Sequence, residues 1–234
     1  MSMRIYTRTG DDGTTGLLFG GRVAKDSVVI ETNGAVDEAQ AALGMVRAEV
    51  EAGSELDDLL VGLERDLYVL MAEVATAPAN RTKLKSGVTL VTEDMVTALE
   101  MHIDSVSTRF PPITDFVIPG HDRVSAGLDV ARTVTRRAER VALAAFEPGA
   151  GSWVGRYLNR LSDLLWAMAR WQEQGDSLRS RAVPVGGGVG AAVREAGSSA
   201  GMQETGARPG MQPTGSSVGM QETESRKGTR KADT

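Results

Sequence analysis

The chain has 234 residues and a formal net charge of −5, with no cysteine and only two histidines. Without cysteine it cannot form disulfides or thiolate metal sites, and this composition fits a reducing compartment, so we expect a cytoplasmic protein. The acidic balance argues against nucleic-acid binding, because phosphate contacts need a basic surface. There is no apolar run of about 18 residues, so we expect neither a membrane span nor a secretory signal.

The first candidate feature is a segment rich in Gly and Thr at residues 6–16, with Arg22 and Lys25 shortly after it. Glycines let backbone N–H groups curl around an anion, and threonine hydroxyls and basic side chains add donors and positive charge. Asp11 or Asp12 could hold magnesium or a ribose hydroxyl. The segment is neither a Walker A loop nor a Gly-x-Gly-x-x-Gly fingerprint. It therefore predicts either a phosphate-binding loop or a plain surface turn.

The body of the chain is predicted to be helical. Apolar residues recur at i, i+3, i+4 and i+7 in five segments, at roughly 27–51, 56–74, 93–108, 122–146 and 152–174. Ser54 is placed to cap the second of these helices. Strand-like alternation is almost absent. The pattern predicts an all-α fold, a five-helix bundle preceded by the Gly/Thr-rich N-terminal loop.

Two single residues stand out before the fourth helix. Asp37 lies among small apolar neighbours in the first helix, so we expect it to be partly buried and paired with an arginine of the fourth helix. Phe116 precedes the turn at Pro119-Gly120. A phenylalanine in a loop is more often a plug in the core than a ligand contact.

The fourth helix carries three arginines on one face, Arg132, Arg136 and Arg140, with Glu139 beside them. Like charges four residues apart repel by a few tenths of a kcal/mol, so this stripe does not stabilise the helix by itself. It indicates either a bound anion or a solvated face. The fifth helix places Asn159 and Asp163 on one face.

A ferritin-like di-iron bundle is excluded, because such bundles need two Glu-x-x-His motifs. Residue 99, three positions before His102, is Leu, and residue 118, three positions before His121, is Ile.

From residue 179 the composition changes to Gly, Ser, Thr, Gln and Glu, and similar hexapeptides at 201–206, 210–215 and 219–224 repeat with a nine-residue period. Such a segment has no apolar face to bury, so ordering it would cost entropy without return. We therefore expect a helical domain over 1–178 and a disordered tail over 179–234.

These motifs, taken in order, resemble the PduO-type ATP:cob(I)alamin adenosyltransferases over about residues 3–174. The resemblance rests on the motifs at residues 6–16, 25–26, 33–38, 116–120, 136–140 and 157–165. It implies a homotrimer with ATP, Mg²⁺ and a corrinoid bound at subunit interfaces, and transfer of the 5′-deoxyadenosyl group of ATP to cob(I)alamin with release of triphosphate. A reductase that supplies cob(I)alamin and a cobalamin-dependent client enzyme are the further partners that it implies.

The resemblance also implies roles for individual residues. The N-terminal segment becomes a nucleotide loop that wraps the triphosphate, through Thr7, Arg8, Thr9, Gly10, Asp11, Gly13, Thr14 and Thr15, with Lys25 beside it. Arg136 would contact phosphate in the transition state, and Arg137, Glu139 and Asn159 would complete the nucleotide site, with Glu139 at the metal. Asp37 and Arg132 look like an intersubunit ion pair beside the corrinoid, and Phe116 would close its lower face.

Two other functions stay open at this point. The chain could be a corrinoid- and ATP-binding module that delivers adenosylcobalamin to a client enzyme without turnover of its own. It could also be a structural helical bundle that acts through its repetitive tail.

Overall fold

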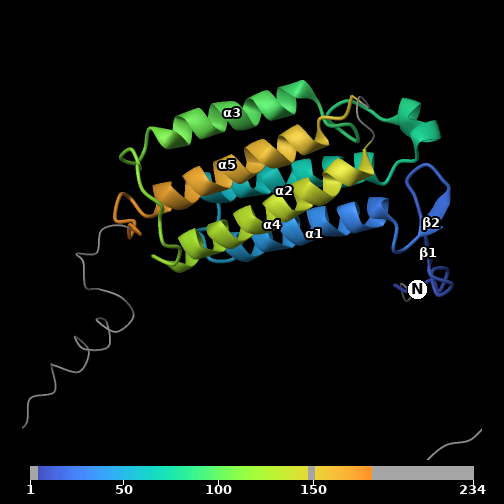
Figure 1. Cartoon of the computed structure of the whole chain (residues 1–234), viewed down its shortest axis with the longest axis horizontal. Coiled ribbons are helices and arrows are strands. Elements are labelled where there is room, and N and C mark those ends of the chain that lie inside the picture. Colours follow the sequence, from blue (N-terminus) through green and yellow to red (C-terminus); the bar gives the residue numbers. More distant parts are fainter. Residues whose placement is uncertain (1–4, 147–150, 181–234) are drawn as a thin grey trace, which may run out of the picture. The chain divides into compact units, whose positions relative to one another are not determined.

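The computed structural model describes residues 5–146 and 151–180. Within them, five long helices form one bundle (Figure 1). They are α1 (Val28–Arg47), α2 (Glu55–Val74), α3 (Glu93–Ser107), α4 (Arg123–Ala145) and α5 (Val154–Gln172). The predicted all-α five-helix bundle is confirmed. Of the tail predicted over 179–234, residues 181–234 lie outside the described residues.

The ends of the helices follow from their capping residues. The Ser54 hydroxyl accepts the Asp57 N–H at 3.2 Å and begins α2, as predicted. Thr92 caps α3 in the same way, and Asp122 begins α4 with a reciprocal capping box. The first helix ends at Arg47, earlier than predicted, and the chain then turns toward α2.

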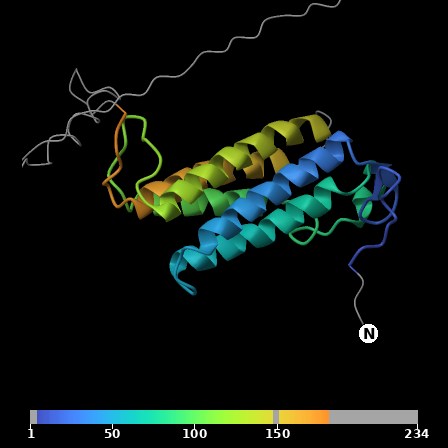
Figure 2. The same cartoon turned by 90° about the horizontal axis from the view of Figure 1, so that it is seen from below.

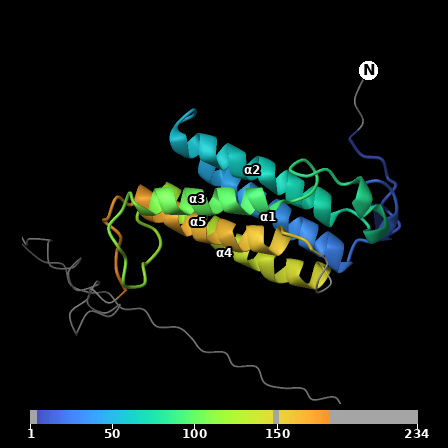
Figure 3. The ribbon, with the colours of Figure 1, turned by 90° about the horizontal axis from the view of Figure 1, so that it is seen from above.

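The helices pack through small and branched residues. In Figures 2 and 3, α1 runs between α2 and α4, and α3 lies over α5. At Gly127 α4 approaches α1 closely, because an added Cβ would lie 2.9 Å from a Val46 methyl group. Fully buried leucines from α1, α2, α4 and α5 fill the core, among them Leu43, Leu60, Leu67, Leu128, Leu158, Leu161 and Leu165.

The two ends of the bundle carry different connecting segments. One end carries a short antiparallel hairpin of β1 (Thr14–Gly16) and β2 (Arg22–Ala24), with the 3-10 helix η1 (Pro78–Lys83) beside it (Figure 1). The other end carries the connection 108–122 and the segment after α5. The hairpin strands have three residues each, too short for an alternating pattern to be visible in the sequence.

Candidate functional site

The Gly/Thr-rich loop is a folded turn that Arg22 holds together. The Arg22 guanidinium donates to the Thr14 hydroxyl at 2.9 Å through Nε and to the Thr9 carbonyl at 2.6 Å. Asp12 accepts the Thr14 N–H at 2.9 Å and the Thr14 hydroxyl at 2.8 Å. These hydrogen bonds hold the pKa of the Asp12 carboxyl below its usual value. Arg22 and Asp12 therefore shape the loop from within.

Lys25 lies against the same loop. A Cβ added to Gly10 would come within 3.1 Å of the Lys25 ammonium nitrogen. The backbone N–H of Lys25 donates to the Gly13 carbonyl at 2.9 Å. Gly13 has a φ of 82°, a conformation that favours glycine. Most of the loop residues are exposed. The predicted loop residues and Lys25 are thus brought together, and the Lys25 side chain is exposed.

A pocket of about 560 Å³ opens between the last turns of α4 and the first turns of α5. Its polar wall is a chain of three side chains. The Asn159 amide donates to Glu139 at 2.9 Å, and the Asn159 carbonyl oxygen accepts Arg160 at 2.6 Å. The last turns of α4 and the first turns of α5 lie toward the hairpin end of the bundle (Figure 1). Glu139 and Asn159, predicted as neighbours from separate helices, are in direct contact.

The arginines of α4 have different partners. Arg137 pairs with Glu38 of α1, and Arg132 pairs with Asp129 at 3.0 Å. Arg140 donates to the Arg136 carbonyl at 2.9 Å. The Arg136 side chain is exposed and has no hydrogen bond or ion pair within the described parts of the chain. Its guanidinium is free to bind an anion.

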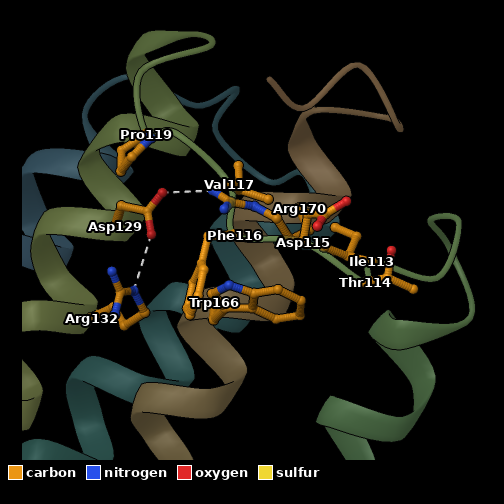
Figure 4. A pocket seen from close by; sticks show the side chains of 10 residues that line it. All are labelled: Ile113, Thr114, Asp115, Phe116, Val117, Pro119, Asp129, Arg132, Trp166 and Arg170. Atoms are coloured by element: carbon orange, nitrogen blue, oxygen red, sulfur yellow. Dashed lines mark hydrogen bonds and ion pairs between the residues drawn. The ribbon is translucent and has the colours of Figure 1, made fainter. Parts of the chain in front are cut away.

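Phe116 lines a second pocket, of about 420 Å³, at the opposite end of the bundle (Figure 4). Its side chain is 78% exposed, so the expectation of a core plug is wrong. Phe110, in the same connection 108–122, is the phenylalanine that packs against the core, edge-on to Trp166. The pocket is lined by Ile113, Thr114, Asp115, Phe116, Val117, Pro119, Asp129, Arg132, Trp166 and Arg170.

A buried ion cluster forms one wall of this pocket, and sequence reasoning missed most of it. Arg170 is 1% exposed and donates to Asp129 at 2.6 Å and to Glu173 at 2.9 Å. Asp129 also accepts Arg132, so Arg132 is oriented toward the pocket by a buried carboxylate (Figure 4). The spacing of three residues from Asp129 to Arg132 and from Arg170 to Glu173 was the available signal.

Asp37 differs from its prediction. It is exposed in the single chain, because it lies on the outer face of α1 while Val36 and Ala39 point into the core. Small neighbours in a helix bury only the residues on their own face. Within the described residues it forms no ion pair, and Arg132 is occupied by Asp129.

No group of three or more His, Asp or Glu side chains that could hold a metal ion occurs among residues 5–146 and 151–180. Glu139 could still serve a magnesium ion as a single carboxylate, because Mg²⁺ is commonly bound by one or two carboxylates together with substrate phosphates. No helix in the described part of the chain is long and apolar enough to span a membrane.

The family described as cobalamin adenosyltransferase matches residues 5–172. The chain belongs to this family. A corrinoid adenosyltransferase of Citrobacter freundii is 43% identical over 171 residues, which cover 73% of this chain and 95% of that protein. The corrinoid adenosyltransferase of Mycobacterium leprae is 39% identical, over 75% and 94% of the two chains.

The fold of this chain is also similar to solved structures of corrinoid adenosyltransferases. A PduO-type ATP:corrinoid adenosyltransferase from Lactobacillus reuteri, a variant with one phenylalanine changed to histidine, was solved with cobalamin and ATP. It matches with a TM-score of 0.68 and 28% identity, over 76% of this chain and 97% of that one. An arginine-to-lysine variant of the same enzyme, complexed with ATP, matches with a TM-score of 0.67.

Proposed function

We propose that this protein transfers the 5′-deoxyadenosyl group of ATP to the cobalt of cob(I)alamin. The observation that carries this proposal is 43% identity to a corrinoid adenosyltransferase over nearly the whole length of that enzyme. The cobalt attacks C5′ with its electron pair, the bond from C5′ to the triphosphate oxygen breaks, and triphosphate leaves with that bonding pair. The products are adenosylcobalamin and triphosphate.

The reaction needs alignment and charge stabilisation rather than an activated side chain, because the substrate cobalt is itself the nucleophile. Exposed Arg136, which has no partner in the described chain, suits the negative charge that develops on the leaving triphosphate. The largely exposed loop at Thr7–Thr15 and the adjacent Lys25 suit the phosphates. Arg137 would exchange its Glu38 partner for phosphate.

The pocket between α4 and α5 suits the nucleotide and its metal ion. Glu139 presents one carboxylate there, fixed by Asn159 at 2.9 Å. A magnesium ion at Glu139 would supply charge neutralisation of the phosphates. Asn159 holds the carboxylate in place.

The Phe116 pocket suits the corrinoid. Phe116 is exposed, so it would offer an apolar surface to the corrin ring and would keep an axial base away from the cobalt. An axial donor stabilises the oxidised metal, so its exclusion makes reduction to Co(I) easier. Arg132 lies at the same pocket and could contact the edge of the ring.

We further propose a homotrimer whose neighbouring subunits complete each site. The loop and the Phe116 pocket lie at opposite ends of one bundle, so a second chain would have to bring a loop to a Phe116 pocket. Exposed Asp37 is then available to pair with Arg132 of a neighbour. Light scattering would give the oligomeric state, and a double-mutant cycle of Asp37→Ala and Arg132→Ala would measure their coupling.

The corrinoid must arrive as Co(I), so a one-electron reductase must act on cob(II)alamin before this step. A cobalamin-dependent enzyme must use the product. We propose that this protein, the reductase and the cobalamin-dependent enzyme all act in the cytoplasm.

The decisive test is adenosylation in solution. Purified protein with ATP, magnesium and cob(I)alamin under reducing conditions should convert the corrinoid spectrum to that of adenosylcobalamin. If the corrinoid binds but its spectrum does not change while the reductant is active, the protein is a delivery module without turnover. If neither ATP nor corrinoid binds, the assignment fails.

A further inference from the structure

The segment that follows α5 is structurally tied to the Phe116 loop. We call residues 173–180 the C-terminal strap. The Ile118 N–H donates to the Leu178 carbonyl at 2.8 Å, and the Ser180 N–H donates to the Phe116 carbonyl at 2.8 Å. Together these bonds form an antiparallel bridge centred on Val117 and Arg179. The strap begins just beyond the family match, which ends at residue 172.

The same strap reaches the buried ion cluster through Glu173. The Glu173 side chain is 0% exposed, and one of its oxygens accepts Arg170 at 2.9 Å. The other accepts the hydroxyl of Ser177, which is itself buried. Asp129 and Glu173 balance the charges of Arg132 and Arg170, so the cluster is neutral overall. Buried charges are tolerated when each faces an opposite charge, as these four do, although the Arg170 Nε is buried without a hydrogen-bond partner in the described chain.

Phe116 needs such external support because its own side chain packs little. Phe116 is 78% exposed, so few side-chain contacts fix its position. The backbone hydrogen bonds to the strap hold the loop that carries it. The strap is in turn packed against the start of the connection: a Cβ on Gly175 would lie 3.2 Å from Pro111. Gly175 has a φ of 94°, which favours glycine.

We infer that Glu173 is a positioning residue for the corrinoid site. Through Arg170 and Asp129 it orients Arg132, and through Ser177 and the strap it holds Phe116. It touches neither substrate. The inference rests on the proposed function only in that Phe116 and Arg132 face the corrinoid; the mechanical link itself does not depend on the reaction.

The first test is Ser177→Ala, which breaks the link to the strap and leaves the four charges in place. Amide exchange at Ile118 and Ser180, followed by NMR, should become about tenfold faster, as expected for losing one supporting hydrogen bond. The KM for corrinoid should rise by about three- to tenfold while the KM for ATP stays within about twofold. Glu173→Gln should produce the same two changes.

Two controls separate positioning from general destabilisation. Tyr157→Phe removes a different, partly buried hydrogen bond, the one from Tyr157 to Asp66 at 2.8 Å, between α5 and α2. It should lower the melting temperature and leave both the Ile118 exchange rate and the corrinoid KM unchanged. Ser177→Thr, which keeps the hydroxyl, should retain the wild-type exchange rate.

Each outcome decides one question. Unchanged exchange at Ile118 and Ser180 in Ser177→Ala overturns the link between Glu173 and the Phe116 loop. Faster exchange with an unchanged corrinoid KM overturns its role in the corrinoid site. An inactive wild type with faster exchange in the variant refutes the proposed function and leaves the link standing.

Discussion

Arg136 and Arg140 are exposed one turn apart on α4, and they differ in their partners within the described chain. Arg140 already donates to the backbone of Arg136, whereas the Arg136 guanidinium has no partner in the described chain. A sequence shows the spacing of such a pair but not which member is engaged. The structure adds this information: Arg140 has a backbone partner and the Arg136 side chain has none in the described chain.

Arg136→Ala should therefore separate catalysis from stability. We expect a loss of turnover of about 100-fold or more, as when one charge-stabilising donor is removed, and a stability change within about 0.5 kcal/mol, as is usual for exposed sites. Adenosylation kinetics and thermal melting measure the two. Arg140→Ala is the matched control and should keep most of its turnover. Equal losses of turnover and stability would return Arg136 to a structural role.

Asp66 gives a pH dependence with a definite sign. Burial raises the pKa of its carboxyl above 3.8, and the Tyr157 hydrogen bond opposes this only in part. The folded state thus binds the Asp66 proton more tightly than the unfolded state. The stability that this proton contributes is complete below pH 3.8 and is lost as the pH rises through the folded pKa.

Urea unfolding at several pH values should reveal this effect. The difference in unfolding free energy between wild type and Asp66→Asn should fall as the pH rises from about 4 to about 7. Asp57 is the contrast, because the Gly53 N–H lowers its pKa, and its contribution is lost only as the pH falls below 3.8. A difference for Asp66→Asn that stays flat over this range would contradict the assignment.

Among the elements, helices were predictable and the contacts between them were not. Apolar spacing located all five long helices, and Ser54 was recognisable as a cap because capping depends on neighbours in sequence. The pairing of Asp129 with Arg170 joins residues 41 positions apart, and no local pattern encodes it. The exposure of Phe116 likewise depends on how a whole connection runs over the bundle.

Gly127 tests how closely α4 approaches α1. Gly127→Ala should destabilise the protein by about 1–3 kcal/mol, because the added methyl group meets Val46 and overpacking outweighs the gain in helix propensity. Gly62 is the matched control: it lies in α2 with nothing within 4 Å of an added Cβ. Gly62→Ala should stabilise by up to about 1 kcal/mol. Similar effects of both changes on chemical denaturation would contradict the close approach.

At the scale of the whole molecule, the boundary between bundle and tail needs one adjustment. The division at residue 178 stays a prediction, but Arg179 and Ser180 belong structurally with the Phe116 loop. The residues of the N-terminal loop form one local motif, so the sequence grouped them, whereas their nucleotide role came from the family resemblance. The strap was not predicted, because its role lies in backbone pairing with a distant loop.

Two truncations test this adjustment. A chain that ends at Ser180 should keep the melting temperature and adenosylation rate of the full chain. A chain that ends at Asp176 loses both strap bonds to the Phe116 loop, so its KM for corrinoid should rise by about threefold or more. Equal kinetics for the two truncated chains would show that the last four described residues are dispensable.

The unbroken course of α4 has a consequence for how the chemistry is spaced. Asp129 lines one pocket and Glu139 the other, and at 1.5 Å per residue they are about 15 Å apart along the axis. The helix therefore fixes the spacing of Arg132, Arg136 and Glu139 along its axis. Side chains in either pocket can change without altering these intervals. A single residue inserted between the two pockets would rotate one end of α4 relative to the other by about 100°, so these side chains would no longer face their present directions.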